Sequence, residues 1–397
     1  MTQRLLGGGL LLFLAACASH DSRPTSVVID TLPSGIIAVH NNVPAAWHDS
    51  TTWYFEEITR IEPRVSGAEA LMNPGFAAVM DNVGRIYVVD QDPARIKVFD
   101  STGQFVRSIG RDGEGPGEYK APFLAMLHGS LIVHDPQLQR VTRFDSAGNV
   151  ITTFRSACCV WGQRSVAVDD SGHIWTQTIP PGEFNHAAVL IRFDTLGRLL
   201  DTLRVPQTQP PDYWVVSRDV DGGHSTSSFK IPGGADELIS VTPSGGLLRA
   251  WSSRYVVTIE DYAGDTTRTF DRPWTPVPVP QEERVQRFSS MTKMLEPRLG
   301  PEIIARDFHL RDVPTARPPM RELDADPSGR IWVETASTDT SATWYDVFDS
   351  TGIWQGTVRA PWPMSADVVW RGTDKVLVRE ADADGLASFV VYRLVES

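Results

Sequence analysis

A repeated pattern of glycine turns and short apolar runs constrains this chain more than any other feature of its sequence. In the clearest copy, Gly84 marks a turn, the apolar run Ile86–Val89 follows, and a second run ends in Phe99-Asp100 before another glycine turn. The first glycine of the pattern recurs at Gly129, Gly172, Gly245, Gly329 and Gly372. Three of the five intervals are 43 to 45 residues long, which is the length of a four-stranded repeat unit, and the two longer intervals contain insertions.

The two ends of the repeat region indicate how the copies are arranged. The sixth copy supplies three strands, over residues 366–370, 375–380 and 388–395, whereas a full unit has four. Trp53–Ile61 precedes the first copy and reads as a strand with no partner of its own. Pairing it with the last copy would close a ring and remove an exposed sheet edge. The sequence therefore predicts an all-β, six-bladed β-propeller over residues 51–397, with the N-terminal strand completing the last blade.

The segment Gly110–Pro122 adds a more specific resemblance. It reads Gly-Arg-Asp-Gly-Glu-Gly-Pro-Gly-Glu-Tyr-Lys-Ala-Pro, and it follows the Gly-x-Ile-x-Val and Phe-Asp-x-x-Gly elements of the first copy. With these motifs the chain resembles the NHL-type (TolB-like) six-bladed propellers, and in particular a lipoprotein group of bacterial six-bladed propellers. The resemblance extends over about residues 53–397, is strongest over 84–122, and weakens in the fourth copy and around 280–319.

The first residues have the layout of an export signal. Arg4 precedes a twelve-residue apolar run, Leu5–Ala16, which is too short to cross a bilayer as a helix. The run ends in Leu14-Ala15-Ala16-Cys17, which resembles a bacterial lipobox, whose cysteine carries a lipid anchor. A plain secretory signal with a coincidental cysteine is the alternative. We expect a signal peptide over 1–16, lipidation at Cys17, and a flexible Ser/Pro/Asp-rich tether over 17–50.

Location and charge narrow the set of partners. Ala18, and not Asp, follows Cys17, which by resemblance to enterobacterial sorting favours the outer membrane over the periplasm-facing inner membrane within the cell envelope. The net charge of −12 repels phosphate backbones, so nucleic acid is not an expected partner. Export would place Cys158 and Cys159 where disulfides persist. A bond between neighbouring cysteines is strained, so two buried thiols are the simpler interpretation, and two cysteines alone are not a zinc site.

Candidate ligand-binding residues lie on the connections from the outer strand of one blade to the inner strand of the next. These connections cross one face of a propeller, and Gly110–Pro122 is one of them. Its glycines leave backbone amides open to a ligand, although a connector needed only for the crossover is the alternative. The candidates on this loop are Arg111, Glu114, Tyr119 and Lys120.

Two longer insertions, Pro206–Pro232 and Pro280–Pro319, are expected on the same face. Pro280 and the glutamates after it suit the first turn of a helix, Val285, Phe288, Met291, Leu295 and Leu299 form an apolar stripe, and Pro297 is expected to end it. A shorter helix is expected over 301–306, so the helical insertion would lie near 280–306. The pair would form either a lid or a packed decoration of the domain. The candidates on the two insertions are Tyr213, Trp214, His224, His309 and Arg311.

The innermost strands bear on whether the chain is an enzyme. They are expected at 76–80, 123–127, 165–168, 238–241, 321–325 and 366–370, and the first four are small or apolar throughout. The others carry Arg321, Glu322, Asp324 and Asp367, a poor ligand set for calcium or zinc. We therefore expect a non-catalytic envelope module that binds a protein, peptide or glycan without a cofactor. The alternative, implied by related lactonases and amidating lyases, is a hydrolase or lyase with Ca or Zn in the channel.

Overall fold

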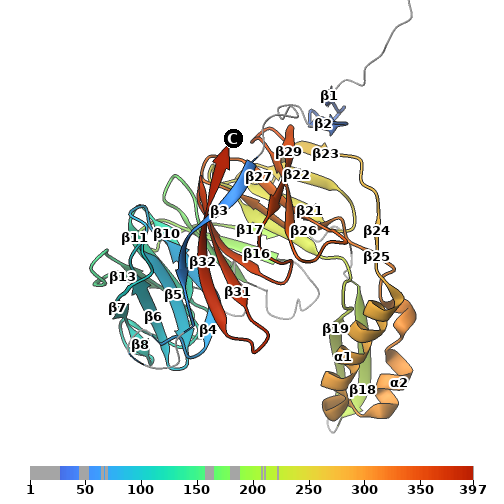
Figure 1. Cartoon of the computed structure of the whole chain (residues 1–397), viewed down its shortest axis with the longest axis horizontal. Helices are drawn as coiled ribbons and strands as arrows, with labels where there is room; N and C mark the ends of the chain where they lie inside the picture. Colours follow the sequence, from blue (N-terminus) through green and yellow to red (C-terminus); the bar gives the residue numbers. More distant parts are fainter. Residues whose placement is uncertain are drawn as a thin grey trace, which may run out of the picture.

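Six sheets, each with four antiparallel strands, are arranged as blades around a central axis, which confirms the six-bladed β-propeller (Figure 1). The computed structural model describes residues 27–43, 53–63, 67, 70–156, 165–178, 188–206, 209, 212–220 and 223–396. Blade 1 comprises β4 (Pro74–Met80), β5 (Ile86–Gln91), β6 (Ala94–Phe99) and β7 (Phe105–Ile109). Blade 2 comprises β10 (Phe123–Leu127), β11 (Ser130–Asp135), β12 (Arg140–Phe144) and β13 (Val150–Arg155). Blade 3 comprises β14 (Val166–Val168), β15 (Ile174–Thr178), β16 (Ala188–Phe193) and β17 (Leu199–Val205).

The other three blades complete the ring. Blade 4 comprises β20 (Glu237–Val241), β21 (Leu247–Trp251), β22 (Val256–Glu260) and β23 (Thr266–Asp271). Blade 5 comprises β26 (Met320–Ala325), β27 (Ile331–Thr335), β28 (Thr343–Phe348) and β29 (Trp354–Ala360). Blade 6 comprises β30 (Asp367–Arg371), β31 (Lys375–Ala381), β32 (Ala387–Glu396) and β3 (Trp53–Ile61). The first strand of each blade lies where the sequence predicts an innermost strand.

The aspartate of the Phe-Asp-x-x-Gly element explains why this element recurs. In blade 1 the carboxylate of Asp100 accepts hydrogen bonds from the backbone amides of Thr102 and Gln104, at 2.9 and 3.0 Å. Gly103 completes the turn with a φ of 82°, a conformation that strains any residue with a Cβ. The same pair of amide bonds is made in later blades by Asp145, Asp194, Asp261 and Asp349.

The hydrophobic core is divided among the interfaces between neighbouring blades. At the interface of blades 4 and 5, the rings of Phe270 on β23 and Phe348 on β28 have centroids 4.6 Å apart. The turn between β28 and β29 also rests on β23, because a Cβ on Gly352 would lie 2.6 Å from the Phe270 side chain. Each blade therefore buries its two faces only when it has a neighbour on both sides, so the fold requires a closed ring.

The predicted closure of the ring is confirmed. β3 pairs antiparallel with β32, from Trp53 opposite Glu396 to Ile61 opposite Phe389. Phe55 on β3 is buried, with its ring centroid 4.8 Å from that of Trp362. The pairing joins strands from the two ends of the domain and leaves blade 6 with four strands.

The two long insertions pack on each other and form a small unit that we call the helical module. It consists of the hairpin β18 (Tyr213–Val220) and β19 (Gly223–Lys230), the helices α1 (Gln281–Leu299) and α2 (Pro301–Asp307), and the single 3-10 turn Leu310–Asp312. Trp214, Leu295, Leu299, Phe308 and Val313 are buried in its own core. Two short strands, β24 (Val277–Pro278) and β25 (Ala316–Arg317), pair where the helices join the propeller.

The predicted end of the long helix at Pro297 is wrong. Pro297 lies inside α1, which continues to Leu299. The helix ends at Gly300, whose φ is 85° and whose backbone N–H donates to the carbonyl of Glu296 at 2.8 Å. Pro297 has no N–H to donate to the carbonyl four residues earlier, so the helix loses one backbone hydrogen bond there and continues for only two more residues.

A hairpin precedes the propeller, so the prediction of a flexible tether over 17–50 is wrong for its central part. It consists of β1 (Val27–Thr31) and β2 (Ile37–Asn41). β2 pairs parallel with β23, the outer strand of blade 4, from Ile37 opposite Arg268 to His40 opposite Asp271. The consecutive apolar residues Ala38 and Val39 become buried there, and the apolar run Ile36–Val39 to which they belong is a local strand signal within a segment that is also rich in Ser, Pro and Asp. Cys17 lies outside the described residues, as do Cys158 and Cys159.

The two faces of the ring differ. The crossovers between blades and the helical module lie on one face, at the bottom of Figure 1, which we call the loop face. The turns that join the first strand to the second and the third strand to the fourth within a blade lie toward the opposite face, at the top, as do the C-terminal end of β32 and the β1–β2 hairpin. Asn41 of the hairpin donates to the carbonyl of Gly352, in a turn of blade 5, at 2.9 Å.

Candidate functional site

The Gly110–Pro122 crossover is held by contacts within itself and to its own blade. Tyr119 is only 1% exposed, and its hydroxyl donates to the carbonyl of Ile109 at 2.9 Å. Burial raises its pKa, and the ring packs on Phe144. The structure thus gives Tyr119 a packing role in place of the predicted ligand contact.

The charged residues of this loop have partners on the same loop. Arg111 lies 2.7 Å from Glu118, whose pKa is lowered by the backbone amide of Gly115 and by Arg111. Lys120 lies 3.2 Å from Asp112, and Glu114 is exposed. These pairs favour the interpretation of the loop as a connector, while ligand contacts of Arg111, Glu114 and Lys120 stay a prediction.

The candidates on the helical module do not converge on one cavity. Trp214 is buried in the module, with its indole N–H donating to Asp312 at 2.9 Å. His224 is exposed near the hairpin tip, 3.0 Å from Asp219. Tyr213 is half-buried, and burial raises its pKa; His309 is half-buried, and the Arg311 side chain is exposed. Trp214 therefore has a structural role, and the other four stay predictions.

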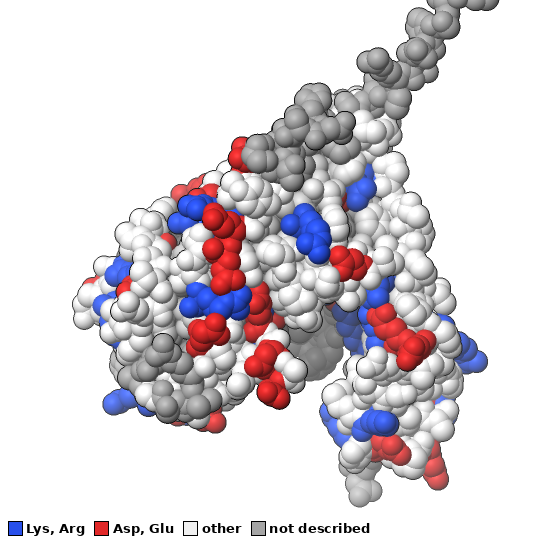
Figure 2. Space-filling view, viewed as in Figure 1, with Lys and Arg blue, Asp and Glu red and all other residues white. Residues whose placement is uncertain are grey.

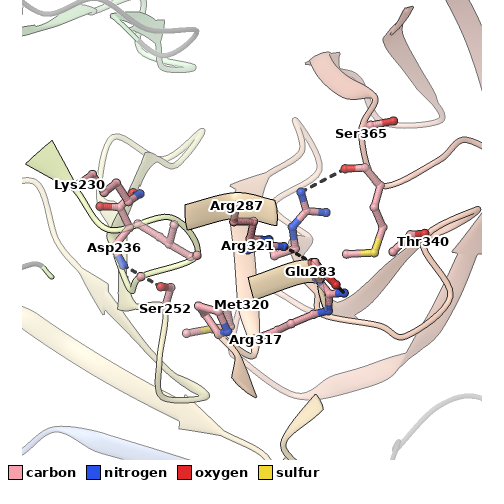
Figure 3. A pocket seen from close by; sticks show the side chains of 15 residues that line it. Lys230, Asp236, Ser252, Glu283, Arg287, Arg317, Met320, Arg321, Thr340 and Ser365 are labelled. Carbon is pink, nitrogen blue, oxygen red and sulfur yellow. Dashed lines mark hydrogen bonds and ion pairs between the residues drawn. The ribbon is translucent and has the colours of Figure 1, made fainter. Parts of the chain in front are cut away.

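A cleft of about 470 Å³ lies where the helical module meets the loop face of blades 4 and 5. Figure 2 shows the notch between the module and the body of the propeller, and Figure 3 shows the lining side chains. The module side is formed by Lys230, Gly233, Glu283 and Arg287, and the propeller side by Asp236, Ser252, Met320, Arg321, Thr340 and Met364. Arg317 and Pro318, in the connection from β25 to β26, cross between the two sides.

Glu283 organises the polar centre of this cleft. Its carboxylate accepts two hydrogen bonds from the guanidinium of Arg317, at 2.9 and 2.7 Å, and one from Arg287 at 2.6 Å. Burial acts to raise the pKa of Glu283, but the two guanidinium groups outweigh it and hold the pKa below its usual value. The forked pairing fixes helix α1 to the connection that leads into blade 5.

The second cleft arginine depends on a glycine. Gly233, which follows β19, has a φ of 78°, and a Cβ there would lie 2.5 Å from Nη1 of Arg287. Only a residue without a Cβ lets the guanidinium approach this closely. The position of Arg287 is thus fixed by close packing against Gly233 and by the hydrogen bond to Glu283.

A cluster of charged side chains lies beside the cleft, toward the central channel. Arg321 on β26 pairs with Glu334 on β27 and donates to the carbonyl of Met364 at 3.1 Å. Burial raises the pKa of Glu334 to about 8, and the Glu322 and Asp367 carboxylates act in the same direction against the opposing Arg321 and Arg371. Burial also raises the pKa of Asp367, whose carboxylate lies 3.6 Å from Arg379.

Sequence reasoning found part of this arrangement. Arg321, Glu322 and Asp367 stand out on innermost strands, but Glu334 lies on the second strand of its blade. A single carboxylate within the apolar run Ile331–Thr335 was the available signal. Glu283 and Arg317 were missed because they meet only when the 280–319 insertion folds back on its own root.

Among the described residues, no three His, Cys, Asp or Glu side chains lie together as a metal ligand set. In the described part of the chain, we therefore find no group of side chains of the kind that binds calcium or zinc. None of the described helices has the length and apolar character needed to cross a bilayer.

Comparisons with known proteins agree with the propeller architecture. A family model described as a 6-bladed beta-propeller, DUF5128, matches residues 76–195, which include blades 1 and 2 and most of blade 3. No curated protein matches the chain. The narrower resemblance to NHL-type lipoproteins stays a prediction.

Several solved structures are similar to this chain at low sequence identity. A member of the duf4221 family from Bacteroides vulgatus has a TM-score of 0.51 at 10% identity, and the match covers 87% of this chain and 99% of that one. A Bacteroides fragilis protein named for its expected export has a TM-score of 0.44 at 10% identity, covering 91% and 99%. Virginiamycin B lyase from Staphylococcus aureus has a TM-score of 0.42 at 10% identity, covering 86% and 100%. At this identity the similarities concern the fold alone.

Proposed function

We propose that this chain is an exported, lipid-anchored binding module of the bacterial cell envelope, which captures its ligand in the cleft between the helical module and blades 4 and 5. The ligand is a protein, a peptide or a glycan. One observation carries the proposal: two insertions from separate crossovers pack into one unit and, against the loop face, enclose a cleft whose charged groups are held in place. Convergent polar groups in a concave site are the usual mark of ligand binding.

The arrangement of the faces supports this assignment. The cleft opens on the loop face, whereas the β1–β2 hairpin, which the chain enters after the predicted anchor, lies toward the other face. A lipid on Cys17 would therefore tether the domain from one side and leave the cleft accessible on the other. The predicted Ca- or Zn-dependent hydrolase or lyase gains no support from the described residues, so we do not propose it.

Site-specific photo-crosslinking in the native envelope tests the binding function. A benzoylphenylalanine residue is introduced at Thr340 or Ser365, two uncharged residues that line the cleft. The matched control is Ala147, which is exposed in a tight turn of blade 2 on the opposite face. We expect one common adduct from both cleft positions and none from the control. No adduct at either cleft position, or the same adduct from all three, would rule out the cleft as the binding site.

A further inference from the structure

The cations of the cleft outnumber the carboxylates that pair with them. Lys230 pairs with Asp236, and Arg321 pairs with Glu334. Arg317 and Arg287 share a single carboxylate, that of Glu283. At least one positive charge is therefore left unmatched at the centre of the cleft, in a chain whose net charge is −12. A local excess of this sign in an acidic protein favours an anionic ligand group.

The unmatched charge has hydrogen-bond donors available. Arg287 donates one N–H of Nη2 to Glu283, and among the described residues its Nε and Nη1 have no hydrogen-bond partner. The second N–H of Nη2, together with its neighbour on the same edge of the guanidinium, can therefore form a parallel pair of donors. The Arg287 side chain is 33% exposed, so these donors are accessible from the cleft. Guanidinium groups bind planar oxyanions with two parallel hydrogen bonds, as Arg317 already does with the Glu283 carboxylate.

The surroundings favour a carboxylate over a phosphate. Glu283 and Asp236 line the same cleft, and their charges repel a dianion more strongly than a monoanion. Two apolar side chains with exposed surface, Leu238 and Met364, line the cleft and would contact an aliphatic body attached to the carboxylate, while Met320 is fully buried. The thioether of Met364 adapts readily to the shape of such a group.

The lining also favours a peptide over a sugar. None of the described residues that line this cleft is aromatic, so the cleft itself offers no ring on which a pyranose could stack. Tyr255 and Trp274 line a neighbouring pocket that shares Gly233, Arg317 and Pro318 with the cleft.

We infer that the cleft binds a carboxylate group of a peptide chain, with the carboxylate on Arg287 and an adjacent aliphatic side chain against Leu238 and Met364. This inference rests on the proposed binding function and specifies the chemical class of its ligand.

Methionine-methyl NMR tests the inference on the full mature chain in detergent. Signals of [methyl-13C]methionine at positions 320 and 364 are assigned with Met320→Leu and Met364→Leu. The probes are N-acetyl-Ala-Leu with a free carboxylate, its C-terminal amide, N-acetyl-Asp-Leu amide, and inorganic phosphate. We expect the free acid to shift both signals saturably and the uncharged amide to bind at least about tenfold more weakly.

Variants assign the contact to one arginine. Arg287→Gln should weaken binding of the free acid about tenfold or more, because Glu283 stays paired with Arg317 and the fold is retained. Arg298→Gln, an exposed change on the same helix, should have no effect. Gly233→Ala should act like Arg287→Gln, whereas Gly385→Ala, with a similar φ of 81° and open space around it, should not.

The other outcomes also decide the question. Equal binding of the Asp-containing amide supports the inference and assigns the carboxylate to an acidic side chain. Equal shifts with the uncharged amide, or tighter binding of phosphate, would overturn it. If crosslinks form in the cleft while acid and amide behave alike, the ligand class is wrong and the binding function stands; if no crosslinks form, the function itself fails.

Discussion

Glu334 shows how a blade can impose a protonation state on a single residue. It lies in the buried strand β27, between the carboxylates of Glu322 and Asp367 and the guanidinium groups of Arg321 and Arg371. Burial raises its pKa from 4.5 to about 8, so the folded protein holds a proton that the unfolded chain releases. Its charge state is thus set by the stacking of blades 5 and 6 around it.

This shift predicts a pH dependence of stability. Between pH 4.5 and about 8 the folded state binds one proton more than the unfolded state at Glu334, so the free energy of unfolding falls as pH rises. The decrease is at most about 1.4 kcal/mol per pH unit and levels off above the folded pKa. Urea unfolding of the wild type and Glu334→Gln should show this as a difference that depends on pH. A difference in the free energy of unfolding that stays constant from pH 4.5 to 8.5 would contradict the assignment. The titration of Asp367 does not contribute to this difference, because both proteins contain that residue.

At the scale of residues, the sequence predicts chemistry best where partners are close along the chain. The aspartates of the turns contact amides two and four residues ahead, so their role follows from the motif. Tyr119 looked like a ligand residue because it lies in a glycine-rich loop, but its hydroxyl donates to the carbonyl of Ile109, at the end of β7. Arg317 and Glu283 are 34 residues apart, and only the folded insertion brings them together.

At the scale of elements, the turn between β28 and β29 fastens blade 5 to blade 4. Gly352 has a φ of 86°, and a Cβ on it would lie 2.6 Å from Phe270. Asn41 of the hairpin donates to its carbonyl and accepts from the amide of Trp354. Three elements that are distant in sequence therefore meet at one glycine.

Gly352→Ala should destabilise the protein by about 3 kcal/mol, the combined cost of a positive φ and of overpacking a tight interface. Gly35→Ala isolates the first contribution, because Gly35 also has a φ of 86° but has nothing within 4 Å of its Cβ position. Its expected cost is about 1 kcal/mol. Chemical denaturation of the two variants measures the difference, and equal stabilities would show that the turn does not clamp the blades.

The elements of the propeller could be predicted because each blade repeats the same order of glycine turns and apolar strands. The innermost strands and the closing strand Trp53–Ile61 were predicted from this repetition and from the missing fourth strand of the last copy. The helical module could not be predicted as a unit, since its hairpin and helices have no repeated counterpart in the other blades. The β1–β2 hairpin was missed because it lies outside the repeat and its partner, β23, is more than 200 residues away.

At the scale of the whole molecule, the anchor prediction is open to a direct experiment. Replacing Cys17 with Ser removes the thiol that would receive the lipid, so the protein should move from the membrane to the soluble fraction. Fractionation of cells that express the wild type and Cys17→Ser measures this. Ala18→Ser, next to the cysteine, serves as the control and should stay in the membrane fraction. Membrane association of Cys17→Ser would mean that something other than a lipid holds the protein there.

The pairing of β2 with β23 determines how the domain would carry tension. If a ligand is held at the cleft while the lipid is fixed in a membrane, the pull enters through β1 and β2 and passes into the outer strand of blade 4. That strand leads directly toward β24 and α1, and the hairpin β18–β19 leads into β20 of the same blade. The line of force thus runs through one sheet, and the seam between β3 and β32 stays unloaded while the hairpin remains attached.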